Sequence, residues 1–218
     1  MTREEWDQLF FTIMPVASLG IGAISIALGA IVALRERAAA QRVSYADTRY
    51  LIDVRYGELH DPRDFVTPYD PSVQAIYCQV GPDAWALYDW VCRDYNYLPD
   101  TGEWWRYPRE TIKARGGDCE DTSILLCSLL KNFNDGYVVL GGYRGYGHAW
   151  VELHGEILET TYTFARPVPD PQDYQAFAMF DNQDLIELWP GAMAEIFAIE
   201  RSEPVKLDLM ARALEKVA

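Results

Sequence analysis

Three side chains in the middle of the chain could act together as a thiol nucleophile with its base. Cys119 stands where Gly116-Gly117 and Asp118 lead into an apolar run typical of a helix. His148 lies in the strand-like segment Gly-His-Ala-Trp-Val-Glu, and Glu159 lies in Ile-Leu-Glu-Thr-Thr. A cysteine, a histidine and a carboxylate in this order can supply the nucleophile, the general base and the acceptor that orients the base. The sequence therefore favours an enzyme that works through a covalent acyl intermediate.

The expected position of Cys119 favours its thiolate form. Asp118 is a good helix N-cap, and Asp121 stands where it can reach back toward the cap, as in a capping box. Cys119 then lies in the first helical turn, where unpaired N–H groups and the helix dipole stabilise negative charge. Glu120 and Asp121 oppose the thiolate through like charge, so a protonated histidine would have to supply much of the stabilisation. An idle cysteine on a capped helix is the alternative, and the downstream histidine and acid argue against it.

A predicted hairpin determines how His148 and Glu159 lie relative to each other. If His154-Gly155 forms a two-residue turn, Leu153 pairs with Glu156. Side chains alternate between the faces of a strand, so His148 and Glu159 then share one face. They would be diagonal neighbours about 7–8 Å apart, a gap that long side chains can close. The register therefore predicts a contact between the imidazole and the carboxylate.

Hydrophobic spacing predicts the elements around these residues and an α+β fold class. The expected helices lie at 72–95 (interrupted at Gly81-Pro82), from Pro108 to Ile112, and at 118–133. The expected strands are 137–140 and the two arms of the hairpin, with a glycine- and tyrosine-rich loop at 141–147. After residue 164 we expect a Pro/Asp loop and helical stretches around 185–188 and 207–217.

Composition narrows the class of function. The chain has 218 residues, of which 50% are hydrophobic, and the part beyond the first ~40 suits one folded domain. A net charge of −14 without a Lys/Arg cluster argues against nucleic-acid binding and against broad docking on anionic lipids. The four cysteines form no C-x-x-C pair and the three histidines lack metal-ligand spacing, so no metal or cofactor is predicted. No feature of the sequence determines an oligomeric state.

An uncharged apolar run near the N-terminus predicts a membrane anchor. The 26 residues from 9 to 34 exceed the ~20 that a helix needs to cross a bilayer. A cleaved signal peptide is the main alternative, but its apolar region should be shorter and follow positive charge, whereas Glu4, Glu5 and Asp7 precede this run. The predicted organisation is a tail at 1–8, a transmembrane helix at 9–34, a stalk or linker at 35–48 and a folded domain at 49–218.

The charges flanking the apolar run predict its orientation. Arg35, Arg37 and Arg42 follow it, and only Arg3 precedes it. The positive-inside bias then predicts a single-pass protein whose C-terminal domain is cytoplasmic. A reducing cytosol would suit a free reactive thiol.

The motifs at 116–121, 147–152 and 157–161 resemble those of the transglutaminase-like superfamily, which has a papain-like fold. More narrowly, they are similar to the bacterial and archaeal transglutaminase-like cysteine peptidases. The resemblance covers roughly residues 72–163. It implies a nucleophile at a helix N-terminus packed on an antiparallel sheet, with Cys119 as nucleophile, His148 as base and Glu159 as third member. The family more often has Asp in that third place.

The resemblance leaves the oxyanion donor open. Papain-like enzymes often use a Gln six residues before the cysteine, where this chain has Lys113. The backbone N–H of Cys119 is one candidate, and the side chain of Trp104 or Trp105 is another. Both tryptophans are equally well suited to plain packing.

Together with the apolar run at 9–34, the resemblance predicts a membrane-anchored thiol hydrolase, a cysteine peptidase or amidase with a peptide or protein substrate. The same chemistry with an amine acceptor would make it a protein-glutamine acyltransferase that cross-links proteins, and the sequence does not separate the two. A non-catalytic binding or scaffold domain is the third alternative, which the complete Cys-His-Glu set disfavours. Some relatives bind calcium through acids beside the cysteine. Glu120 and Asp121 could do so here, but helix capping is the simpler interpretation.

Overall fold

The computed structural model describes residues 42–100 and 102–200. Within these two ranges, no helix combines the length and apolarity that crossing a bilayer requires. The predicted tail, the predicted transmembrane helix at 9–34 and the predicted helical stretch at 207–217 lie outside the described residues, so they stay predictions.

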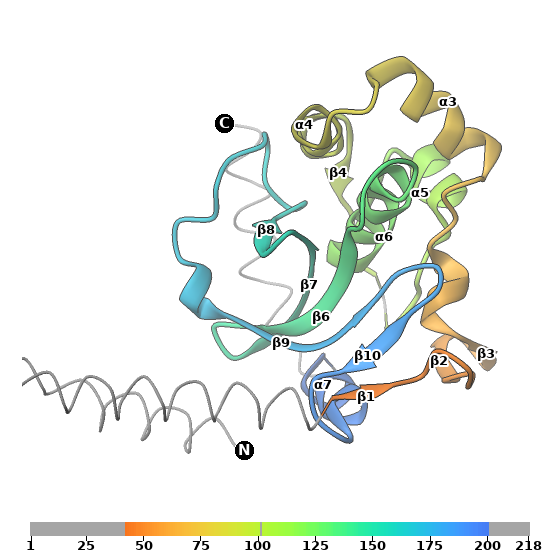
Figure 1. Cartoon of the computed structure of the whole chain (residues 1–218), viewed down its shortest axis with the longest axis vertical. Coiled ribbons are helices and arrows are strands. Elements are labelled where there is room, and N and C mark those ends of the chain that lie inside the picture. Colours follow the sequence, from red (N-terminus) through yellow and green to blue (C-terminus); the bar gives the residue numbers. More distant parts are fainter. Residues whose placement is uncertain (1–41, 101, 201–218) are drawn as a thin grey trace, which may run out of the picture. The chain divides into compact units, whose positions relative to one another are not determined.

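A six-stranded antiparallel sheet with the order β1-β10-β9-β6-β7-β8 forms the centre of the described part (Figure 1). Its central strands β6 and β9 each pair along nearly their whole length. Strand β1 falls within the predicted linker at 35–48, and its pairing with β10 extends the sheet into that segment. The strands are β1 (Val43–Ser44), β6 (Tyr137–Tyr143), β7 (Tyr146–Leu153), β8 (Glu156–Leu158), β9 (Tyr174–Phe180) and β10 (Leu185–Glu187).

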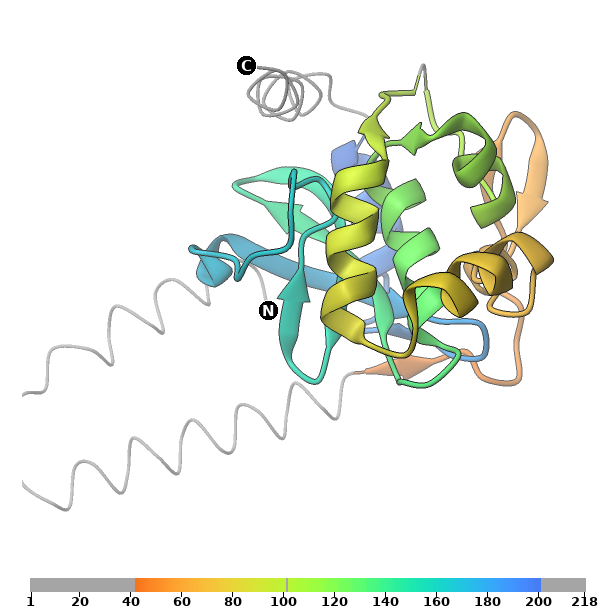
Figure 2. The same cartoon turned by 90° about the horizontal axis from the view of Figure 1, so that it is seen from above.

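Helix α6 (Cys119–Leu130) is the centre of the core, because all twelve of its residues are buried. It packs on β6 and β7, and three other helices pack around it (Figure 2). These are α3 (Pro71–Val80), α4 (Ala84–Asp94) and α5 (Pro108–Ala114). A further helix, α7 (Ala192–Glu200), packs against β6, β7 and β9. The second half of α6, residues 124–130, is apolar apart from Ser128, and a segment of this kind needs such enclosure.

Several short elements lie between the helices and strands of this core along the chain. An irregular hairpin joins β2 (Ile52–Arg55) and β3 (Glu58–His60), and a parallel pair joins β4 (Asn96–Tyr97) and β5 (Gly116–Gly117). Two 3₁₀ turns occur at Pro62–Phe65 and Pro171–Asp173. The β4–β5 pair fixes the position of Gly116 and Gly117, which lie just before Asp118 and Cys119.

Much of the expected architecture is confirmed. The structure is a mixed α and β fold with the helix that begins at Cys119 packed on an antiparallel sheet. The hairpin register is also confirmed, since Leu153 pairs with Glu156 across the turn. The predicted break between two helices falls at Gly81, where α3 ends.

Two predictions were wrong. The expected loop at 141–147 is mostly strand, because β6 continues to Tyr143 and the turn occupies only Arg144-Gly145. The expected helix around 185–188 is strand β10, which pairs with β9. Both errors concern short segments, in which apolar periodicity does not separate strand from helix and glycine is taken as a loop signal.

Candidate active site

Two glycines, Gly116 and Gly117, precede Asp118 and Cys119 in a tightly packed part of the structure. Residues 116 and 117 form β5, paired side by side with Asn96 and Tyr97 of β4. A Cβ atom on Gly116 would lie 2.6 Å from the Asn96 carbonyl oxygen, and one on Gly117 would lie 2.4 Å from the Cβ of Asp121. Only glycine fits these positions. The Cys119 side chain that follows opens helix α6 and is 7% exposed.

The acids around Cys119 do not form the predicted capping box. Asp118 is the N-cap by position, but its side chain makes no capping bond, and its Oδ1 has no hydrogen-bond partner among the described residues. Asp121 instead accepts bonds from the backbone N–H and the guanidinium of Arg106. The prediction was wrong because Arg106 competes for Asp121. Glu120 accepts a hydrogen bond from the Cys119 thiol, Sγ to Oε2, at 3.1 Å.

Burial and mutual repulsion raise the pKa values of these acids. Burial, followed by the charges of Glu103 and Asp121, raises the pKa of Glu120 to about 8. Burial also raises the pKa of Asp121 to about 6, although Arg106 opposes this. The pKa of Asp118 is raised well above its usual value by burial and by its acidic neighbours. At neutral pH Glu120 is therefore largely uncharged, which weakens the like-charge penalty on a Cys119 thiolate.

His148 and Glu159 make the contact that the hairpin register predicts. Nε2 of the imidazole lies 2.7 Å from Oε2 of the carboxylate, and both side chains are buried. Nδ1 of His148 has no hydrogen-bond partner among the described residues. A carboxylate can only accept, so it selects the tautomer with the proton on Nε2 and leaves Nδ1 as the basic nitrogen.

Glu159 is held ionised by the groups around it. Burial acts to raise the pKa of this carboxyl, but the charge and hydrogen bond of His148 and two bonds from Thr161 lower it to about 2. The backbone N–H and the hydroxyl of Thr161 donate to Oε1 at 3.0 and 2.6 Å. A buried carboxylate with this many donors stays charged at every pH at which the protein would work.

Thr160, the residue after Glu159, contacts helix α6, which begins at Cys119. The Thr160 hydroxyl lies 2.8 Å from that of Thr122 and 3.2 Å from that of Ser123, both in the first turns of α6. The segment that holds His148 thus lies against the beginning of the helix that carries Cys119. All three predicted residues come from elements that contact one another, since α6 also packs on β7.

Aromatic residues that the sequence analysis did not select surround His148. The ring centres of Tyr143, Trp150 and Tyr174 lie 5.8, 6.2 and 6.1 Å from that of His148. The Tyr174 hydroxyl also donates to Oε2 of Glu159 at 2.8 Å. Trp150 could have been found from strand alternation, because it stands two residues after His148. Tyr174 lies 26 residues from His148 in the sequence, and no local signal points to it.

The two candidate oxyanion tryptophans pack elsewhere. Trp105 is fully buried, with its ring stacked on Phe180 at 5.7 Å and edge-on to Phe65 at 5.5 Å. The guanidinium carbon of Arg55 lies over the ring of Trp104, 4.5 Å from the ring centre. These contacts favour the packing role that the sequence left open for both residues.

Three carboxylates near the thiol could hold a cation. Ligand atoms of Asp100, Asp118 and Glu120 all lie within 4.8 Å of one another. Oxygen donors of this kind suit a hard cation such as Ca²⁺, and the partnerless Oδ1 of Asp118 fits a ligand position. Of the two acids that the resemblance suggests for calcium, Glu120 belongs to this group and Asp121 does not. Asp100 comes from the preceding loop, and no signal beside Cys119 points to it.

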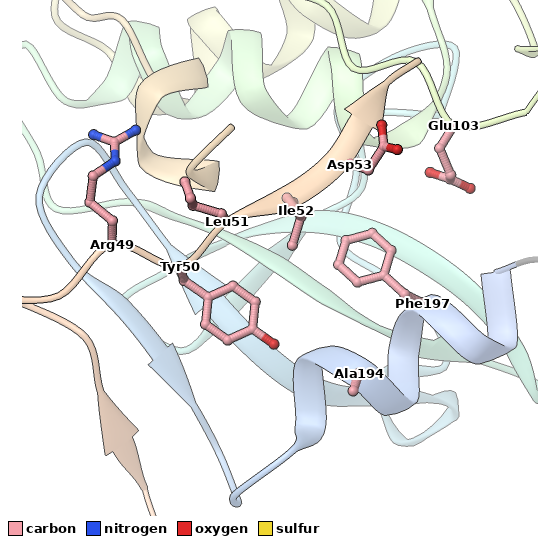
Figure 3. Close-up of a pocket in the computed structure, with 8 residues that line it drawn as sticks. All are labelled: Arg49, Tyr50, Leu51, Ile52, Asp53, Glu103, Ala194 and Phe197. Carbon is pink, nitrogen blue, oxygen red and sulfur yellow. The ribbon is translucent and has the colours of Figure 1, made fainter. Parts of the chain in front are cut away.

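A separate pocket lies between the segment 49–53 and helix α7. It has a volume of about 340 Å³, and Figure 3 shows Tyr50 and Ile52 facing Ala194 and Phe197 of α7. None of the three predicted site residues is among its lining residues, which are Arg49, Tyr50, Leu51, Ile52, Asp53, Glu103, Ala194 and Phe197.

One comparison with known proteins, a match to a family profile, agrees with the motif resemblance. The sequence profile of the transglutaminase-like superfamily matches residues 79–157. No curated protein sequence matches the chain. Among solved structures, a Cytophaga hutchinsonii protein assigned as a cysteine protease is similar, with 21% identity and a TM-score of 0.40 over 57% of this chain.

Legionella pneumophila LapG is also similar. Its calcium-bound structure has 16% identity and a TM-score of 0.41, over 63% of this chain and 84% of LapG. A second LapG structure has 16% identity and a TM-score of 0.42, over 70% of this chain and 95% of LapG. The present chain matches half the length of the Cytophaga protein. The residues that the profile matches, 79–157, include Cys119 and His148 and are similar to the transglutaminase-like superfamily.

Proposed function

We propose that the chain is a thiol hydrolase, a cysteine peptidase or amidase that cleaves peptide or amide bonds through an acyl-enzyme. Cys119 would be the nucleophile, His148 the base and Glu159 the acceptor that orients the base. One observation carries the proposal: Glu159 occupies Nε2 of a buried histidine and leaves Nδ1 without a partner among the described residues. An imidazole held in this way is prepared to take up a proton.

The proposed reaction has two stages, acylation of Cys119 and hydrolysis of the resulting thioester. Nδ1 of His148 takes the thiol proton while Sγ of Cys119 attacks the carbonyl carbon of the substrate. The tetrahedral adduct collapses to a thioester, and the leaving amine takes the proton from Nδ1. Water next attacks the thioester and gives a proton to Nδ1, after which the acid leaves and the thiol is restored. Glu159 stays ionised throughout and stabilises the imidazolium.

The backbone N–H of Cys119 would serve as the oxyanion donor in this proposal. The first N–H groups of a helix have no partner within the helix, and Cys119 is the first residue of α6. Its N–H can therefore stabilise negative charge on the carbonyl oxygen as Sγ attacks.

A divalent cation such as Ca²⁺ would be held by Asp100, Asp118 and Glu120, where its positive charge would offset the repulsion among buried carboxylates. Arg106 already offsets part of it by pairing with Asp100 and Asp121. Engagement of Glu120 away from the thiol would free Cys119 from the bond that it makes in this structure.

The site's location in the cell is a second part of the proposal. The uncharged run at 9–34 supports attachment to a membrane by a single helix, and the arginines at 35, 37 and 42 support a cytoplasmic domain.

The decisive experiment separates hydrolysis, transamidation and binding alone. The full-length chain, purified in detergent, would be incubated with a proteome-derived peptide mixture in H₂¹⁸O with a labelled primary amine. Hydrolysis places ¹⁸O at new carboxyl termini, whereas acyl transfer adds the mass of the amine. Cys119→Ala should abolish either product, and Cys78→Ala, at an exposed cysteine of α3, should not. Mass spectra that are identical for wild type and Cys119→Ala would leave a non-catalytic scaffold as the function.

A further inference from the structure

We propose that Tyr174 is a positioning residue, which fixes the carboxylate of Glu159 and through it the tautomer of His148. The role deepens the proposed function and rests on it. The Tyr174 hydroxyl donates to Oε2 of Glu159 at 2.8 Å. That oxygen is the one that accepts from Nε2 of His148 at 2.7 Å.

Both oxygens of Glu159 are held from two sides. Oε1 accepts from the hydroxyl and the backbone N–H of Thr161, and Oε2 accepts from His148 and Tyr174. A glutamate has one more rotatable bond than an aspartate, so its carboxylate has more ways to turn away from the imidazole. Tyr174 therefore adds a second donor to Oε2, beside the histidine that must itself be oriented.

A bulge in β9 puts Tyr174 on the face of His148. Consecutive residues of β6 pair with Ala178 and then with Ala176, so Phe177 is an extra residue on β9. One extra residue reverses the face that the remaining side chains take. Tyr174 therefore shares a face with Ala176, which lies across β6 from His148, and not with buried Ala178.

The ring of Tyr174 packs independently of its hydroxyl. Its centre lies 4.5 Å from that of Tyr143 and 5.2 Å from that of Trp150. Trp150 reaches this place over Gly141, where a Cβ atom would lie 2.4 Å from the indole. Tyr174→Phe should keep these contacts and remove the bond to Glu159, together with the hydrogen bond between the Tyr174 and Tyr162 side chains.

The chain offers a matched control for a purely structural bond of this kind. The Tyr45 hydroxyl donates to Oε2 of buried Glu187 at 3.1 Å. Glu187 also accepts from the backbone N–H groups of Gly191 and Met193, outside the candidate site. Tyr45→Phe therefore removes the same chemical bond without touching His148.

The test reads the histidine directly. The chain contains three histidines, so ¹⁵N-histidine labelling of the full-length protein gives few resonances, which His148→Gln assigns. In wild type and Tyr45→Phe, we expect His148 near neutral pH to be protonated on Nε2. In Tyr174→Phe, we expect a mixture of tautomers, with kcat on a cleaved peptide lowered about tenfold and KM changed less than twofold. Tenfold corresponds to about 1.4 kcal/mol, the scale of one bond to a charged group.

Each outcome decides one question. An unchanged His148 tautomer in Tyr174→Phe would overturn the positioning role, even if activity fell. A changed tautomer in a protein that cleaves nothing would support positioning and count against the proposed function. If Tyr174→Phe does not fold, 3-fluorotyrosine at position 174 keeps the ring and makes the hydroxyl a stronger donor. A His148 Nε2 resonance that this replacement leaves unmoved would also overturn the role.

Discussion

Tyr88 holds Glu159 by its backbone. Its hydroxyl accepts from the Glu159 N–H at 3.1 Å and donates to the Glu159 carbonyl at 3.2 Å. Strand β8 ends one residue earlier, so a side chain from α4 replaces the partner strand at this point. The carboxylate therefore starts from a fixed backbone position although it lies beyond the sheet.

Tyr88→Phe should remove the partner of the buried Glu159 N–H, whereas the Glu159 carbonyl still accepts from the Tyr162 N–H. We expect the free energy of unfolding to fall by about 1–3 kcal/mol, as for buried groups left unpaired, and activity to fall as well. Chemical denaturation followed by tryptophan fluorescence would measure the change. Tyr77→Phe is the control, because Tyr77 stacks on Phe133 away from Glu159. Equal stability of the two variants would contradict the role of Tyr88.

Glu159→Gln should lower turnover by roughly two to four orders of magnitude, because the amide keeps the size of the side chain but not the charge that stabilises the imidazolium. Glu159→Asp should lose less, since it keeps the charge and only shortens the reach. Glu152→Gln is the control, because Glu152 pairs with Ile157 and lies four residues along the strand from His148. Loss of activity in Glu152→Gln, with activity kept in Glu159→Gln, would refute the assignment of the third residue.

Cys119 should react with iodoacetamide at neutral pH faster than the other three cysteines. Cys78 is exposed, so accessibility alone predicts that it reacts first. Cys127 should be inert, because burial raises the pKa of its thiol. Site-resolved mass spectrometry of the folded protein would give the four rates. A Cys78 rate above that of Cys119 would indicate that Cys119 is not activated.

The buried acids near Cys119 should make stability fall as pH rises. Burial raises the pKa of Glu120 to about 8 in the folded state, against about 4.5 for an exposed glutamate, so between these values the folded state binds more protons than the unfolded state. The free energy of unfolding must then decrease across that window. The thermal midpoint should drop from pH 5 to pH 8, and CaCl₂ should restore more of it at pH 8 than at pH 5. Glu120→Gln should flatten the slope, whereas Glu156→Gln at an exposed position should not.

The start of the folded domain can be tested by two truncations. A chain of residues 42–218 keeps β1 and the Tyr45–Glu187 bond, so it should retain a cooperative thermal transition. A chain of residues 49–218 begins at the boundary that the sequence predicts and lacks both features. We expect it to melt several degrees lower, or to aggregate. Identical midpoints would restore the predicted boundary at 49.

The local part of the site was accessible from the sequence because each feature depends on nearby residues. The glycine pair before Cys119 and the two-residue turn at 154–155 both predict backbone geometry over a few positions. The alternation of side chains along the two strands then predicts that His148 and Glu159 share a face. The structure contains the hydrogen bond between them.

The remaining contacts were not accessible because they join distant segments. Arg106, in the loop before α5, donates to Asp121, which therefore does not cap α6. Asp100, in the same loop, lies beside the carboxylates of Asp118 and Glu120. The face of Tyr174 depends on a bulge between β6 and β9, and a single sequence carries no signal for a shift in pairing between strands. Pairing also decided β10, where three residues are strand because β9 lies beside them.

The enclosure of α6 on all sides has a consequence for its dynamics. All twelve of its residues are buried, so its amides become exposed only when the surrounding helices and the sheet separate from it. Its amide protons should therefore exchange with solvent mainly through global unfolding, far more slowly than those of the loop segments 98–100, 102–103 and 163–170. Cys119, the first residue of this helix, would then stay in place, and movements of the surrounding loops would control access to its thiol.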